Sequence, residues 1–227
     1  ALEQSKGRGQ KGNSWLSAPG INLTFSVVLK YAQTLPESLK SGLLMPLKAT
    51  DQFAVSEAAA LSVVDLLSES GIQAEIKWPN DIYVGDRKIC GILIENSLRE
   101  KWLFTSIIGI GLNINQQNFN VSLINPTSVV IENTEIRQID LNEALVKYMD
   151  YFTDLYHRYQ SGKSAEIRDS FLSKLWRKDA SYEFIDTREN IRFYGKIRGI
   201  NNIGMLIIEN NEGELMEFAF KEISYII

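Results

Sequence analysis

The stretch Lys77-Trp78-Pro79-Asn80-Asp81-Ile82-Tyr83-Val84-Gly85-Asp86-Arg87-Lys88-Ile89-Cys90-Gly91-Ile92-Leu93-Ile94-Glu95 gives the strongest indication of the fold. Its dipeptide Gly85-Asp86 separates two strand-forming runs, and two residues of this type between such runs favour a tight antiparallel hairpin. The preceding Pro79-Asn80-Asp81 is typical of a turn. We therefore expect strands at residues 82–84 and 87–95, paired antiparallel around a two-residue loop.

The hairpin has a predictable register. From the loop outward, its expected pairs are Val84 with Arg87, Tyr83 with Lys88, Ile82 with Ile89 and Asp81 with Cys90. Because side chains alternate between the two faces of a strand, alternate residues share a face. On one face this register places Asp81, Tyr83, Lys88 and Cys90. Asp81 would lie diagonally to Lys88, at about 7–8 Å between backbones, which long side chains can bridge. Lys88 is then either aimed into a polar pocket or solvated on an exposed hairpin.

Helices and further strands flank the hairpin. Residues 51–70 place apolar side chains on one broad helical face, and Gly71 stands where a helix-ending glycine belongs. The other elements expected before residue 178 are strands at 21–29, 74–78 and 102–110 and helices at 141–160 and 164–176. These helices are too few and too irregularly spaced for a doubly wound parallel sheet. We therefore predict an α+β fold with a mixed or antiparallel sheet.

The pattern changes near residue 179. From there on, short strand-forming segments alternate with polar or glycine turns, at 182–185, 191–200, 205–209, 215–220 and 223–226. A run of short strands of this kind is typical of a small β-barrel. We therefore expect two domains, with residues 1–178 holding the helices and residues 179–227 forming a small SH3-like barrel.

The composition is that of an ordinary globular protein, with 227 residues, 44% hydrophobic, 23% charged, and a formal net charge of −4. The sequence contains neither a basic block nor a helix-turn-helix pattern, which argues against DNA binding by this chain. No run approaches the ~18 apolar residues of a membrane span, and no signal peptide is recognisable. A single cysteine excludes a disulfide framework. We therefore expect a cytoplasmic protein without membrane association.

A glycine-rich loop near the start could hold an anion. Gly7-Arg8-Gly9-Gln10-Lys11-Gly12-Asn13-Ser14-Trp15 combines three glycines, whose backbone can approach a ligand closely, with two cations. It is not a P-loop, because the Gly-Lys-Ser/Thr ending is absent. On its own it fits a solvated surface loop at least as well. Gly109-Ile110-Gly111-Leu112-Asn113 likewise suits either a ligand site or a plain strand with a tight turn.

Other reactive or aromatic residues are better explained by structure than by chemistry. His157 is the single histidine of the sequence, so a Ser-His-Asp site or a histidine–metal site cannot be built. Cys90 is expected to be a buried strand thiol. We expect Trp102, Phe104 and Trp176 in the core rather than at a ligand.

Together and in this order, the motifs resemble those of the biotin protein ligases, the biotin–[acetyl-CoA-carboxylase] ligases. Residues 7–20 meet the family pattern of Gly-Arg-Gly, Gly-x-x-Trp and Pro-Gly, and Lys77-Trp78-Pro79-Asn80-Asp81 matches the second motif residue for residue. Residues 86–93 match the third motif and residues 109–113 the fourth. The resemblance covers residues 1–115. It implies a class II synthetase-like catalytic core that forms biotinyl-5'-AMP from biotin and ATP. It further implies transfer of biotin to a lysine of a biotin carboxyl carrier protein.

The resemblance also implies roles for individual residues. Lys88 and Arg8 would offset negative charge in catalysis, and Asp81 is our hypothesis for the carboxylate that receives or orients the acceptor amine. The biotin site would comprise Gln4, Arg8, Gly9, Gln10, Lys88 and Gly91. The ATP or adenylate site would comprise Gly7, Arg8, Gly9, Gln10, Lys11, Gly12, Asn13, Trp15, Lys77, Asn80 and Asn113. Mg²⁺ would accompany ATP, and no metal ligand is assigned to it. We expect the glycine loop to close over the adenylate.

The sequence departs from the family pattern at two places. The family usually opens with a Ser/Thr-Asn segment, which would lie upstream of Ala1. Because the chain starts without Met, we expect further residues before it. Many members carry Arg or Lys where this chain has Gln10.

Three further questions stay open at this stage. Lipoate ligases and octanoyl transferases resemble the same core and are the nearest enzymatic alternative. A biotin-responsive regulator is the non-enzymatic one. The family often dimerises through its sheet, so a homodimer is also considered.

Overall fold

The computed structural model describes residues 1–9, 14–31, 44–121 and 123–226. Its first sheet has the strand order β1-β5-β4-β3-β2, and every neighbouring pair is antiparallel. The strands are β1 (Leu23–Lys30), β2 (Glu75–Lys77), β3 (Asp81–Val84), β4 (Arg87–Arg99) and β5 (Trp102–Leu112). The predicted α+β class and strand pattern are confirmed, and the sheet is antiparallel rather than mixed.

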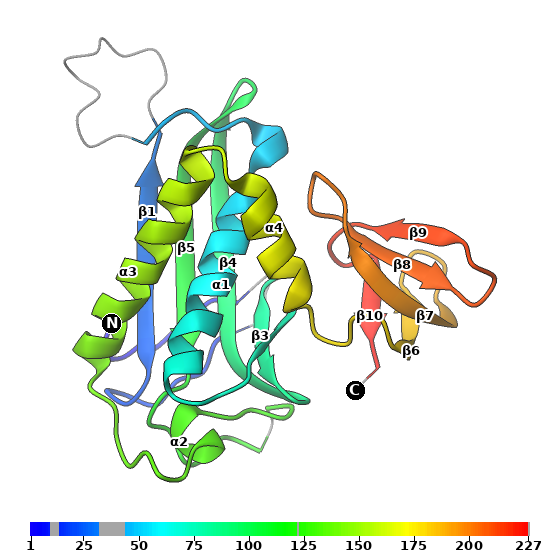
Figure 1. Cartoon of the computed structure of the whole chain (residues 1–227). Coiled ribbons are helices and arrows are strands. Elements are labelled where there is room, and N and C mark those ends of the chain that lie inside the picture. The colour runs from blue at the N-terminus through cyan, green and yellow to red at the C-terminus, as the bar shows by residue number, and fades with distance from the viewer. Residues whose placement is uncertain (10–13, 32–43, 122, 227) are drawn as a thin grey trace.

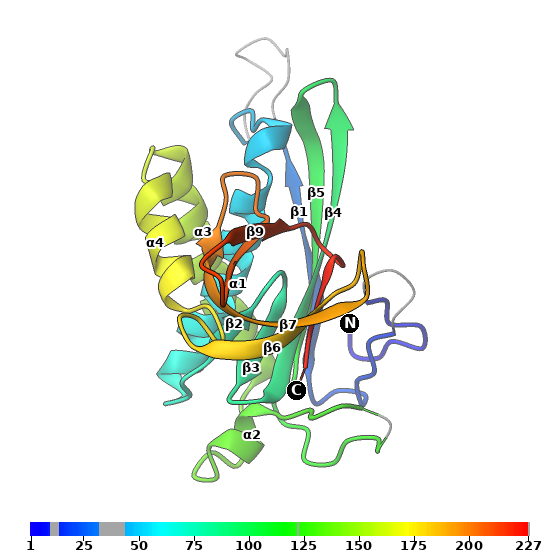
Figure 2. The same cartoon turned by 90° about the vertical axis from the view of Figure 1, so that its right-hand side faces the viewer.

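Three helices cover one face of this sheet (Figure 1). They are α1 (Phe53–Glu69), α3 (Leu141–Gln160) and α4 (Ser164–Ser173). Helix α1 is buried along most of its length. Helix α3 is capped at its N-terminus by Asp140, whose side chain accepts hydrogen bonds from the backbone N–H groups of Asn142 and Glu143. The opposite face of the sheet carries the N-terminal segment (Figure 2).

Two short helical elements were not predicted. They are η3 (Ala49–Asp51) and α2 (Val129–Glu132), which lies between β5 and α3. Both are about one turn long, and so short an element has too little periodicity to be seen in a sequence. Among the described residues, no helix is both long and apolar enough to cross a membrane.

The predicted hairpin forms, but its register is wrong beyond Tyr83. Val84 pairs with Arg87 and Tyr83 with Lys88 as expected, and then Ile82 pairs with Cys90 and Asp81 with Gly91. The shift leaves Ile89 as an extra residue in β4, which is a β-bulge. Ile89 and Cys90 are therefore both buried in the core behind the sheet, and Cys90 does not share the face of Lys88. The buried thiol itself was predicted correctly.

A second antiparallel sheet follows α4. Its order is β10-β6-β7-β8-β9, with β6 (Ser181–Asp186), β7 (Ile191–Ile200), β8 (Leu206–Asn210), β9 (Leu215–Phe218) and β10 (Ile223–Tyr225). Its interior is apolar, since Phe184, Ile197 and Phe218 are almost fully buried. The short strands expected at the end of the chain are thus confirmed as an antiparallel sheet.

The three aromatic residues that we expected in the core differ in their burial. Trp176 is buried as expected, Trp102 is half-buried, and Phe104 is 49% exposed, so its assignment to the core is wrong. Phe104 is the residue of β5 that a β-bulge leaves without a partner on β4, since Thr105 pairs with Ser97 and Leu103 with Leu98. The expectation of burial was based on the aromatic character of the residue alone, which gives no sign of a β-bulge.

Candidate active site

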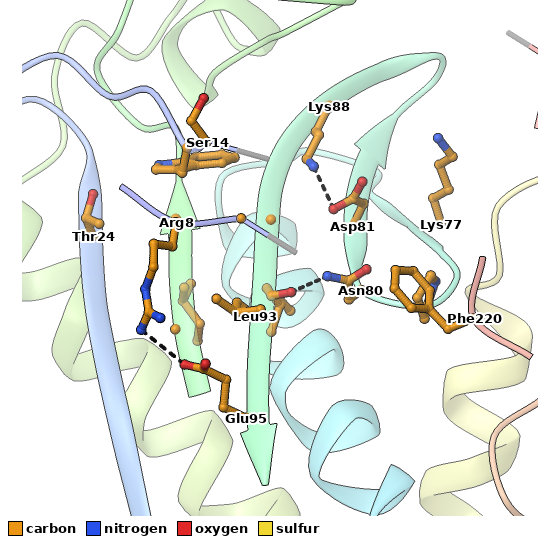
Figure 3. Close-up of a pocket in the computed structure, with 18 of the residues that line it drawn as sticks. Arg8, Ser14, Thr24, Lys77, Asn80, Asp81, Lys88, Leu93, Glu95 and Phe220 are labelled. Carbon is orange, nitrogen blue, oxygen red and sulfur yellow. Dashed lines mark hydrogen bonds and ion pairs between the residues drawn. The ribbon is translucent and has the colours of Figure 1, made fainter. Parts of the chain in front are cut away.

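A cavity of about 770 Å³ is lined by the N-terminal segment and by strands of the first sheet. Its walls come from the N-terminal segment, β1, β4, β5, the turn before β3, and the end of the chain around β10. This volume is typical of sites for small molecules. Figure 3 shows Arg8 and Glu95 at one side of the cavity and Lys77 and Phe220 at the other, with Asp81 and Lys88 between them.

Lys88 and Asp81 form an ion pair in this cavity. Lys88 Nζ lies 2.7 Å from Asp81 Oδ1, and the two side chains are 31% and 24% exposed (Figure 3). The bulge at Ile89 turns Lys88 onto the same face as Gly91, while the two residues between them point into the core. Lys88 is therefore aimed into a polar pocket, and the alternative of a solvated lysine on an exposed hairpin is wrong.

The backbone of Lys88 is fixed from outside the sheet. Its N–H donates to the Asn125 carbonyl at 2.7 Å, and its carbonyl accepts from the Thr127 N–H at 2.9 Å. The segment between β5 and α2 thus pairs with the start of β4 as an extra bridge. A cation whose main chain is held in this way needs little reorganisation when an anion binds.

The turn that precedes β3 is fastened to β4 through Asn80. The Asn80 carbonyl accepts from the Ile92 N–H at 2.9 Å, and the Asn80 side-chain amide donates to the Ile92 carbonyl. The peptide bond between Trp78 and Pro79 in the same turn is cis. Both contacts of Asn80 hold Asp81 at a fixed place beside Lys88.

Trp15 lies against two glycines in the cavity floor. Gly91 and Gly111 are cross-strand partners on β4 and β5. A Cβ on Gly111 would fall within 2.5 Å of Trp15 Nε1, and one on Gly91 would lie 3.1 Å from Trp15 Cζ3. The backbone of Trp15 is held in turn by Gly7, whose carbonyl accepts from the Trp15 N–H at 2.9 Å. The two strand glycines are needed because a side chain there would collide with the indole.

Arg8 is paired across the cavity mouth with Glu95. Arg8 Nη2 lies 3.4 Å from Glu95 Oε2, and the two side chains are 75% and 49% exposed (Figure 3). An ion pair this exposed contributes little to stability. Arg8 is therefore free to exchange this partner for an anionic ligand at small cost.

The structure brings most of the predicted site residues to one cavity. Its lining includes Gln4, Arg8, Gly9, Trp15, Lys77, Asn80, Asp81, Lys88 and Gly91. Gly7 hydrogen-bonds to the backbone of Trp15 and is not among the residues that line the cavity. Four predicted residues, Gln10, Lys11, Gly12 and Asn13, lie outside the described residues, so the expected closure of their loop stays a prediction.

Asn113 is not placed in the cavity. It is 3% exposed, its amide donates to the Thr127 carbonyl at 2.9 Å, and its N–H donates to the Ile89 carbonyl at 3.0 Å. Its contacts therefore fix the segment that holds the Lys88 backbone, which is a supporting place rather than one beside a ligand.

Several lining residues were missed by sequence reasoning. They include Thr24, Ser26, Leu93, Glu95, Phe220 and Tyr225. Ser26 and Leu93 could have been found, because each aligns with Gly109 in the antiparallel ladders. Phe220 and Tyr225 could not, since they reach the site from the other end of the chain.

The cavity collects cations and polar groups rather than metal ligands. The positively charged lining residues are Lys6, Arg8, Lys77, Lys88 and Lys221, and they face the carboxylates of Asp81 and Glu95. Burial lowers the pKa of Lys77, an effect that the nearby Asp81 carboxylate partly opposes. Such a surface suits an anionic ligand with a carboxylate or phosphates. Among the described residues there is no cluster of three or more His, Cys, Asp or Glu side chains that could hold a metal ion.

Comparisons with known proteins find related sequences along the chain. Residues 1–113 match the model of the biotin/lipoate A/B protein ligase family. The bifunctional ligase/repressor BirA of Bacillus subtilis (strain 168) is 31% identical over 230 residues, which are 94% of this chain and 61% of that protein. The biotin--[acetyl-CoA-carboxylase] ligase of Paracoccus denitrificans is 25% identical over 94% of this chain and 84% of its own.

The fold is also similar to a solved structure. A biotin protein ligase from Aquifex aeolicus in complex with biotin and ATP superposes with a TM-score of 0.74 and 25% identity, over 98% of this chain and 85% of that one. The present chain spans 61% of the length of the first curated relatives that it matches. The match of residues 1–113, the sequence relatives and the shared fold lead to one conclusion: residues 1–113 of this chain belong to the biotin/lipoate A/B protein ligase family.

Proposed function

We propose that the protein is a biotin protein ligase, which activates biotin with ATP and transfers it to a lysine of a biotin carboxyl carrier protein. The observation that carries the proposal is the Lys88–Asp81 pair, which stands 2.7 Å apart in a cavity that Arg8 also lines. The relatives named as biotin ligases, and the similar structure that holds biotin and ATP, support it.

The first half-reaction needs the cations. An oxygen of the biotin carboxylate attacks the α-phosphorus of ATP, the bond to the β-phosphate breaks, and pyrophosphate leaves. Both reactants are anions, so fixed positive charge must offset their repulsion and the charge that develops in the transition state. Lys88 and Arg8 have this role in our proposal, since their present partners, Asp81 and Glu95, can be exchanged for ligand oxygens.

The second half-reaction needs a carboxylate. The neutral amine of the acceptor lysine attacks the acyl carbon, AMP leaves with the electrons of the C–O bond, and the amine loses a proton. When Lys88 turns to the phosphate, Asp81 has lost its cation and can receive or orient that amine. We therefore assign this part to Asp81.

In this proposal Mg²⁺ would enter the site together with ATP and would not be held by the protein alone. Magnesium is commonly bound through one or two carboxylates together with substrate phosphates. Asp81 and Glu95 supply carboxylates in the cavity. When bound, the ion would shield the phosphate charges.

The finer architecture is part of the same proposal. We assign residues 1–178 to a class II synthetase-like catalytic domain and residues 179–227 to an SH3-like barrel, supported by the change from helices to short strands after α4 (Ser164–Ser173). We also assign the reaction to the cytoplasm, where ATP is available. A homodimer through the sheet has some support from Val28 and Ile107. These two are cross-strand partners and are 52% and 41% exposed.

One assay separates this function from its nearest alternative. Exchange of label between pyrophosphate and ATP is measured separately with biotin, lipoate and octanoate as the acid. The proposal predicts exchange with biotin. Exchange with lipoate or octanoate but not with biotin would instead make the protein a lipoate or octanoate enzyme of the same family.

A further inference from the structure

Lys77 is surrounded by three aromatic rings at the wall of the cavity. Its Nζ lies 4.7 Å from the ring centre of Tyr83, 5.1 Å from that of Tyr225 and 5.5 Å from that of Trp176. It also donates a hydrogen bond of 3.1 Å to the Tyr83 hydroxyl. Each distance is within the range in which a ring face attracts a cation. We call Tyr83, Trp176 and Tyr225 the Lys77 cage.

The cage joins parts of the chain that are far apart in sequence. Tyr83 belongs to β3, Trp176 follows α4, and Tyr225 lies on β10 of the C-terminal sheet. The Trp176 ring centre is 5.1 Å from that of Tyr83 and 5.6 Å from that of Tyr225. Trp176 is fixed by its Nε1, which donates to the Gly85 carbonyl at 2.7 Å. Tyr225 is thus the one member that the C-terminal sheet supplies.

A second set of contacts ties the neighbouring residue to the same sheet. Trp78 Nε1 donates to the Gly204 carbonyl at 2.9 Å, and the Trp78 ring packs edge-on against Phe220. The turn that leads to Asn80 and Asp81 therefore packs against the C-terminal part of the chain. Phe220 and Lys77 lie on the same side of the site (Figure 3).

In the part of the chain that the structure describes, Lys77 has no ion-pair partner of its own. Among the described residues, the carboxylate of Asp81 is the acid that acts on it, and that carboxylate is already paired with Lys88. Lys88 and Arg177 both act on Lys77 as like charges. Aromatic rings attract a cation without supplying an opposite charge, so within the described ranges no carboxylate of its own competes with a cavity ligand for the Lys77 ammonium.

We propose that Tyr225 is a positioning residue for Lys77: its ring holds the ammonium at the cavity wall, so that the C-terminal sheet sets how well Lys77 meets the phosphates of ATP. The inference rests on the proposed function, since the anion that Lys77 meets is taken to be ATP. The ring, and not the hydroxyl, has this role. The Tyr225 hydroxyl is buried and has no hydrogen-bond partner among the described residues.

The test compares a variant that removes the Tyr225 ring with one that keeps it. Tyr225→Met fills the space without a π face, Tyr225→Phe keeps the ring, and Phe193→Leu is the control. Phe193 belongs to the C-terminal sheet and stacks on Phe218, so its loss weakens that sheet without a ring contact to Lys77. In ATP–pyrophosphate exchange with biotin, Tyr225→Met should raise KM for ATP on the order of tenfold and leave KM for biotin unchanged. Tyr225→Phe and Phe193→Leu should keep the wild-type KM for ATP.

A double-mutant cycle decides whether Tyr225 acts through Lys77. Lys77→Met alone should raise KM for ATP, and Tyr225→Met should add little in the Lys77→Met background. Full additivity, or an equal rise in KM for ATP in the Phe193→Leu control, would overturn the inference. If Tyr225→Met does not fold, Tyr225→Leu replaces it in the cycle. Absence of biotin-dependent exchange in the wild-type protein would overturn the proposed function itself, which is a separate result.

Discussion

The ammonium of Lys88 lies 2.7 Å from the carboxylate of Asp81, although the two residues are not cross-strand partners. The bulge at Ile89 brings Lys88 to the face of Gly91, which is the partner of Asp81. Within this pair each charge stabilises the other. A bound phosphate would compete with Asp81 for Lys88 and so release the Asp81 carboxylate. The pair is therefore suited to the two successive half-reactions of the proposed function.

Removal of the lysine charge should abolish the first step. Lys88→Met loses a preorganised cation, and the rate of adenylate formation should fall about 10²–10³-fold. Single-turnover formation of biotinyl-5'-AMP from biotin and ATP measures this rate. Arg99→Met is the control, because Arg99 lies at the far end of the same strand, β4, outside the cavity lining. A Lys88→Met rate within twofold of the wild type would contradict the assignment.

Removal of the carboxylate should affect the second step. Asp81→Asn keeps the size of the side chain but cannot take a proton, so adenylate should form while transfer to the acceptor lysine becomes slow. Both rates are measured on the same preparation, the first without acceptor and the second after acceptor is added. Equal losses in both steps would show that Asp81 acts by holding Lys88.

A methyl group added at Gly111 should be destabilising, whereas one added at Gly109 of the same strand should be tolerated. Gly111→Ala places a Cβ within 2.5 Å of Trp15 Nε1, so we expect a loss of about 1–3 kcal/mol in the free energy of unfolding, or displacement of Trp15. Gly109→Ala is the matched control on the same strand, because its nearest neighbours would be at 3.6 Å. Urea unfolding and tryptophan emission report the two effects. Identical behaviour of the two variants would mean that Trp15 does not lie on Gly111.

The stability of the protein should carry a pH signature from Glu57. This side chain on α1 is 2% exposed and contacts Arg168 of α4, and burial, opposed by Arg168, raises its pKa from 4.5 to about 7. The folded state therefore holds a proton that the unfolded state releases between these pH values. The stabilisation is complete below about pH 4.5 and is lost as pH rises through about 7, with an amplitude of up to about 3 kcal/mol.

Glu57→Gln tests this signature by removing the titrating group. The free energy of unfolding of the wild type, minus that of Glu57→Gln, should be larger at pH 5 than at pH 8. Urea unfolding of both proteins at a series of pH values measures the difference. Parallel curves for the two proteins would contradict the raised pKa.

The sequence predicted those features that depend on local pattern. Residues 141–160 form a helix with the expected bounds, and Gly85-Asp86 forms the expected hairpin loop, because periodicity and turn chemistry act over a few residues. The register beyond Tyr83 was missed, since two adjacent apolar residues, Ile89 and Cys90, fit either side of a bulge equally well. A bulge of this kind leaves no composition signal.

The site was predicted in part for the same reason. Lys88, Asp81 and Asn80 come from one motif, so their neighbourhood follows from one hairpin. The place of Trp15 on Gly91 and Gly111 depends on contacts between distant segments, and so does the contact of Tyr225 with Lys77. No local pattern specifies which distant segments meet.

Direct identification of the intermediate tests the central claim that this cavity activates biotin. The protein is incubated with biotin and ATP in the absence of acceptor, and the nucleotide released on denaturation is identified by mass spectrometry beside a parallel sample with Lys88→Met. We predict biotinyl-5'-AMP in an amount close to one per wild-type chain and a large loss of its formation rate with Lys88→Met. Wild-type protein that yields no biotinyl-5'-AMP, but forms the adenylate of lipoate or octanoate under the same conditions, would contradict the account.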